Sequence, residues 1–88
     1  MARPLRIEEI INAVESEFFQ QHVLVKNVSL YLCHRYTANK LKQIGGHFNI
    51  GESAVSQANR RISVKIKQDK ILKKQIKRIE KKLNLSIV

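Results

Sequence analysis

The sequence predicts an all-α domain of about five helices with a central helix-turn-helix. Apolar residues recur every three or four positions along nearly all of the 88 residues, a spacing typical of helices that bury one face. Only three Gly and one Pro interrupt this pattern, without a linker or an internal repeat. A hydrophobic content of 43% supports a single core. We therefore expect one domain over residues 1–88, with flexible ends at 1–4 and 85–88.

The first predicted helix spans Leu5–Gln20. Pro4 suits the start of a helix, and Glu8 and Glu9 lie near the positive end of the helix dipole. The expected core stripe consists of Ile7, Ile10, Ile11, Val14 and Phe18, with Phe19 at its edge.

The second predicted helix spans Val28–Tyr36, with Asn27 or Ser29 as its cap. The residues expected to face inward are Val28, Leu32 and Tyr36, or alternatively Leu32 and Cys33. The preceding His22–Val25 segment has the composition of a short strand. Because no partner strand is found elsewhere, we prefer a loop or a helix start.

The segment Leu41–Ile62 has the pattern of a helix-turn-helix. Its first helix is expected to begin near Asn39 or Lys40 and to end at His47 or Phe48; the second begins at Glu52 or Ser53, either of which could be the N-cap. The short Asn49–Gly51 turn forces the two helices into contact, and Gly51 is the glycine that a sharp turn often requires. Gly45 lacks a side chain where the second helix would approach.

A fifth helix is predicted to follow Asp69, a plausible N-cap. Its apolar stripe consists of Leu72, Ile76, Ile79 and Leu83. This spacing resembles coiled-coil positions but covers less than two heptads. We prefer packing against the protein's own core, with a coiled-coil homodimer as the alternative.

Charge is distributed very unevenly along the chain. The formal net charge is +10, and the segment from Arg60 to Lys82 has eleven cationic residues against two acidic ones, a net of +9. Residues 1–20 carry a net of −2. A field of one sign over one segment attracts polyanions such as nucleic acids. A solvated Lys-rich helix face is the simpler alternative.

The second helix of the predicted helix-turn-helix is the candidate DNA-reading element. If Val55, Ala58 and Ile62 face the core, counting 100° per residue places the polar residues of this helix on the opposite face. The predicted DNA-contacting residues are Ser53, Ala54, Ser56, Gln57, Arg60, Arg61, Lys40, Lys42 and Lys65. Gln57 could pair with adenine, and Arg60 with guanine or phosphate.

No pattern in the sequence indicates an enzyme. His22, His34 and His47 are isolated, without the spacing of a metal site, and there is no Gly-rich phosphate loop. Cys33 has no partner for a disulfide within the chain, so we expect a buried apolar residue in a reducing compartment. We predict no cofactor, no metal and no small-molecule substrate. Without an apolar run of ~18 residues or a signal-peptide pattern, we expect a cytoplasmic protein without membrane contact.

The stretch from Tyr31 to Ile62 resembles the C-terminal DNA-binding domain of the bacterial replication initiator DnaA. The matching residues are Leu32, Thr37, Leu41, Ile44, Gly45 and Phe48, followed by Ser53, Ala54, Val55, Ala58, Arg60 and Ile62. The resemblance covers residues 5–84 and implies a Trp-repressor-like fold, sequence-specific binding of double-stranded DNA and a location at the nucleoid. The run SAVSQA and the opening MARPLRIE are similar to transposases associated with repetitive extragenic palindromes. The initiator's Arg-Asp-His core and basic loop have no counterpart here.

Two alternatives to a DNA-binding function remain open. The apolar stripe of the fifth helix could make the chain a protein-interaction or dimerisation module. RNA binding is less favoured, because few aromatic residues are candidates for stacking on bases.

Overall fold

The computed structural model describes residues 6–37 and 39–83, and within them it contains five helices and no strand. The helices are α1 (Ile7–Glu17), α2 (His22–Tyr36), α3 (Leu41–Phe48), α4 (Glu52–Gln68) and α5 (Lys70–Lys82). The predicted all-α fold is thus confirmed. The expected flexible ends and the expected helix start at Leu5 lie outside the described residues. None of the helices in the described part is both long and apolar enough to span a membrane.

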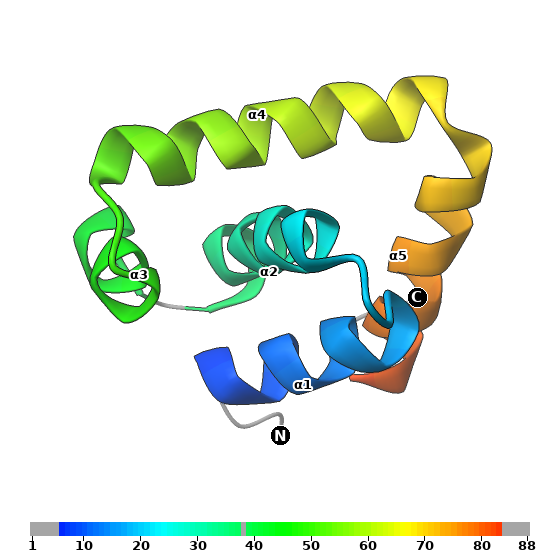
Figure 1. Ribbon diagram of the computed structural model, residues 1–88, viewed down its shortest axis with the longest axis horizontal. Helices are drawn as coiled ribbons and strands as arrows, with labels where there is room; N and C mark the ends of the chain where they lie inside the picture. Colours follow the sequence, from blue (N-terminus) through cyan, green and yellow to red (C-terminus); the bar gives the residue numbers. More distant parts are fainter. Residues whose placement is uncertain (1–5, 38, 84–88) are drawn as a thin grey trace.

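Helix α2 lies at the centre of the molecule (Figure 1). It packs against α1 on one side and α4 on the other, and α3 contacts it as well. All six residues of the run Val28–Cys33 are consequently buried. A helix that is covered on several sides has no polar face in its middle, and this run is apolar apart from Ser29 and the hydroxyl of Tyr31.

The start of α2 differs from the sequence prediction. The helix begins at His22, not at Val28, and neither Asn27 nor Ser29 caps it. Ser29 is fully buried, and its hydroxyl has no hydrogen-bond partner among the residues that the structure describes. The helix start was one of the two preferred interpretations of His22–Val25. Leu24 and Val25 are partly buried against the core, which explains why this segment is helical although Val25 favours strands.

Helix α1 is shorter than predicted. It ends at Glu17 rather than at Gln20, which has a left-handed φ of 67°. Phe18 directly follows the helix and is fully buried, as expected. The turn rotates the next residue away from the core, so Phe19, expected at the edge of the stripe, is 75% exposed.

The connection between α3 and α4 is tight, as predicted, but the left-handed residue of the turn is Asn49 and not Gly51. Asn49 adopts the left-handed conformation (φ 58°, ψ 45°), which Asn tolerates better than most residues. Gly51 has an extended backbone (φ −80°, ψ 167°) and acts as the N-cap of α4, so the predicted need for glycine there, and for a cap at Glu52 or Ser53, is wrong. Gly45 does permit a close approach, because a Cβ there would lie 2.6 Å from the carbonyl oxygen of Ile50.

Helix α5 begins as predicted. The side chain of Asp69 accepts hydrogen bonds from the backbone N–H groups of Ile71 (3.0 Å) and Leu72 (3.1 Å). Asp69 is also the C-cap of α4, so it is the single non-helical residue between the two helices. The α5 stripe packs inside the chain: Leu72, Ile76 and Ile79 are buried, and Leu83 is partly buried.

Polar contacts hold α5 against the helices before it. The hydroxyl of Tyr36 donates a hydrogen bond to the carboxylate of Glu80. Burial raises the pKa of the Tyr36 phenol, and the bond to Glu80 adds to this effect. Near the end of α5, Arg78 forms an ion pair with Glu17 of α1 at 3.4 Å. These contacts join α5 to both α2 and α1.

Candidate nucleic-acid interface

Helix α4 presents one face to the core and the opposite face to solvent. Val55, Ala58 and Ile62 are buried, each no more than 4% exposed. They contact the core formed with α2, α3 and α5, which leaves the other side of α4 uncovered (Figure 1). Ser53, Gln57 and Arg60 are therefore exposed, as counting along the helix predicts.

All nine residues predicted to contact DNA are exposed. Those on α4 are Ser53, Ala54, Ser56, Gln57, Arg60, Arg61 and Lys65. Lys40 is the N-cap of α3, and Lys42 lies in its first turn. The backbone N–H of Lys40 donates to the side chain of Gln43 at 2.9 Å, so the start of α3 is held in place while both lysines face solvent. Exposure makes these side chains available for binding.

The cations of α4 and those at the far end of α5 lie on different parts of the molecule. Arg60, Arg61, Lys65 and Lys67 belong to α4, whereas α5 leaves the end of α4 and runs back to α1 (Figure 1). The last turn of α5 faces the C-terminal end of α1, where the side chain of Lys82 donates a hydrogen bond to the hydroxyl of Ser16 at 3.2 Å. The outer face of α4 therefore has its own set of cations, apart from the far end of α5.

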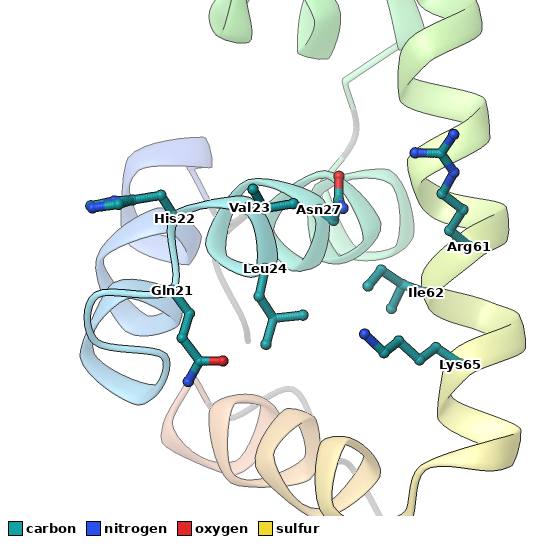
Figure 2. Close-up of a pocket in the computed structure, with 8 residues that line it drawn as sticks. All are labelled: Gln21, His22, Val23, Leu24, Asn27, Arg61, Ile62 and Lys65. Carbon is teal, nitrogen blue, oxygen red and sulfur yellow. The ribbon is translucent and has the colours of Figure 1, made fainter.

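Helices α2 and α4 form a groove that the sequence did not predict. Its larger hollow has a volume of about 470 Å³. The residues that line it are Gln21, His22, Val23, Leu24, Asn27, Arg61, Ile62 and Lys65. In Figure 2 the side chain of Lys65 reaches from α4 toward α2, and Asn27 lies on the opposite wall.

A second hollow of about 310 Å³ continues the groove toward the start of α4. Its lining residues are Val23, Lys26, Asn27, Leu30, Ile50, Ala54, Gln57, Ala58 and Arg61. Because α2 and α4 are far apart in the sequence, only the packing of the two helices brings Lys26 and Asn27 beside the predicted residues Gln57 and Arg61.

The nucleophilic and metal-binding candidates remain separate in the structure. Cys33 is fully buried, and burial raises the pKa of its thiol to about 12. Among residues 6–37 and 39–83, no group of three or more His, Cys, Asp or Glu side chains is placed to hold a metal ion.

No protein-family model and no curated protein matches the chain. The resemblance to the DnaA C-terminal domain therefore stays a prediction from the residues that carry it.

Proposed function

We propose that the chain binds double-stranded DNA in a sequence-specific manner, with α4 in the major groove. The observation that carries this proposal is the outer face of α4. This helix has 17 residues, a length of about 25 Å, and its solvent face carries mainly polar and cationic side chains, over which none of the described helices is packed. A polar helix face of this length, held rigidly by a buried opposite face, suits insertion into a major groove.

The arrangement of α3 and α4 supports the same proposal. The two helices are joined by the three residues Asn49–Gly51 and contact each other, and a Cβ added at Gly45 would lie 3.4 Å from Cγ2 of Val55. A short turn between two contacting helices supports the interpretation of α3 and α4 as a helix-turn-helix. In that motif the N-terminal residues of the second helix contact base edges, while the first helix crosses the backbone. Lys40 and Lys42, exposed at the start of α3, would then contact phosphates.

The side chains near the start of α4 have the chemistry needed to read bases. Gln57 can donate to and accept from adenine at once, and Arg60 can donate two hydrogen bonds to guanine. Ser53 and Ser56 are short enough to allow a close approach, and Ala54 can contact a thymine methyl group. The DnaA-like character, the nucleoid location and the link to transposases belong to this proposal as expectations from the sequence.

The alternative of a dimerisation module receives less support. The apolar side chains that would form its seam, Leu72, Ile76 and Ile79, are buried in the core of a single chain. The outward residues of α5 are mainly lysines, which do not make an apolar seam. We therefore propose DNA, not a partner helix, as the ligand.

The proposal is tested by selecting binding sites from a pool of random duplexes with the wild-type chain and two variants. Gln57→Ala removes a base-reading side chain, and the expected result is loss of preference at one or two base pairs, about 1–3 kcal/mol for a bidentate contact. Gln68→Ala is the matched control, because Gln68 is also exposed but lies at the far end of α4. This control should keep the wild-type preference.

Two results would count against the proposal in different ways. If the wild-type chain enriches no sequence over the starting pool, sequence-specific binding is refuted. If both variants select the same sites as the wild type, Gln57 is not a base-reading residue and the orientation proposed for α4 is wrong.

A further inference from the structure

We infer that the groove between α2 and α4 binds the phosphate backbone of one DNA strand, with Lys26 of α2 as a contact on the opposite wall from α4. This inference rests on the proposed function and extends it to a helix in which the sequence indicated no DNA contact.

The two hollows adjoin each other between α2 and α4. Val23, Asn27 and Arg61 line both of them, so the hollows border each other at these three residues. Ala54, Gln57, Arg61 and Lys65 line the α4 wall at intervals of three and four residues, along one side of the helix. This wall is about 16 Å long, which is several times the ~3.4 Å axial rise per nucleotide of a strand, so more than one phosphate can lie beside it.

The chemistry of the walls fits a phosphodiester chain. Three cations line the groove, Lys26 from α2 and Arg61 and Lys65 from α4, and every other lining residue is uncharged or a histidine. The amide side chains of Gln21 and Asn27 add hydrogen-bond donors. Phosphate oxygens accept from all of these groups, and such contacts position a protein on DNA without reading its sequence.

The apolar part of the groove fits the sugars between the phosphates. Leu24 and Ile62 line the larger hollow, and Val23, which lines both hollows, is 76% exposed. An exposed valine flanked by cations would contact deoxyribose carbons, which offer an apolar edge between charged groups. The groove also adjoins the proposed reading face, because Gln57 belongs to both. A strand in the groove would therefore border the major groove that α4 enters.

The test compares charge removal in the groove with charge removal elsewhere. Lys26→Gln/Lys65→Gln removes one cation from each wall, and Lys77→Gln/Lys81→Gln removes two exposed cations of α5. All four lysines are exposed, so the fold should be retained, which circular dichroism checks. Affinity for a random 25-base-pair duplex is measured by fluorescence anisotropy at 50–200 mM KCl.

Each phosphate contact contributes about 0.9 to the slope of log K against log salt concentration. We expect the groove double variant to reduce the magnitude of this slope by about 1.8, so that its binding depends less on salt. The α5 double variant should change the slope by much less. Lys26→Arg/Lys65→Arg keeps both charges and should retain the wild-type slope.

The outcomes separate the two proposals. If the wild type binds duplex but the groove variant lowers the slope no more than the α5 variant, the groove does not bind the backbone, and the proposed reading by α4 is unaffected. If the arginine variant reduces the salt dependence of binding as much as the glutamine variant does, the effect does not come from charge, and the inference is again overturned. If the wild type binds no duplex, both proposals fail.

Discussion

Replacing Gly45 with alanine should destabilise the protein, although alanine is the better helix former. A Cβ at this position would lie 2.6 Å from the carbonyl oxygen of Ile50 and 3.4 Å from Cγ2 of Val55. The first atom is backbone, and the turn that carries it is held by the hydrogen bond from the N–H of Ile50 to the carbonyl of Gly45, at 2.8 Å. The added methyl group cannot fit without moving the turn.

The magnitude follows from two opposing terms. Gly→Ala inside a helix stabilises by about 1 kcal/mol, whereas overpacking a tight contact costs about 1–3 kcal/mol. Gly45→Ala should therefore lower the free energy of unfolding by about 1 kcal/mol. Gly46 is the matched control on the same helix, because a Cβ there meets nothing within 4 Å. Gly46→Ala should raise the stability by up to about 1 kcal/mol.

Urea denaturation followed by circular dichroism measures both variants. A difference of about 2 kcal/mol between them corresponds to roughly 8–16 °C in melting temperature for a domain of this size. If Gly45→Ala proves as stable as Gly46→Ala, the close contact of α3 with the turn does not exist, and the packing of α3 against α4 described here is wrong.

Four further predictions can be checked by the same denaturation or by simple chemistry. Asn49→Gly should leave stability nearly unchanged, whereas Asn49→Ala should cost about 1 kcal/mol, because alanine disfavours the left-handed conformation; equal stability of the two would contradict the turn. Asp69→Ala should cost about 1 kcal/mol through loss of the α5 cap, with Asp69→Asn retaining most of the stability. Ser29→Ala should stabilise by about 1 kcal/mol, since it removes a buried hydroxyl that has no hydrogen-bond partner within residues 6–37 and 39–83; destabilisation would mean that the hydroxyl is bonded. Because burial raises the pKa of the Cys33 thiol to about 12, a disulfide reagent at pH 8 should modify it slowly in native protein and rapidly in urea.

Local patterns in the sequence predicted the elements that depend on near neighbours. The cap at Asp69 and the buried face of Val55, Ala58 and Ile62 were both found correctly, because each depends on spacing within one helix. The same reasoning placed Gln57 on the exposed side of α4. These are the parts of the fold in which periodicity and capping act without help from distant residues.

The errors arise where tertiary packing or a choice between similar residues decides the outcome. Asn49 and Gly51 are both compatible with a left-handed turn, and the sequence does not indicate which of them adopts it. The start of α2 depends on contacts of Leu24 and Val25 with the core, which override the strand preference of Val25. Lys26 remained unnoticed because its neighbours across the groove come from a distant part of the chain.

The single residue between α4 and α5 has a mechanical consequence. With Asp69 capping both helices, there is no linker to absorb a rotation of one relative to the other. Helix α5 is in turn attached to α1 by the pair of Arg78 and Glu17 and to α2 by Tyr36 and Glu80. The tilt of α4 is thus governed in part from the opposite side of the molecule. A substitution that loosens α1 could misalign the outer surface of α4 while leaving every side chain on that surface intact.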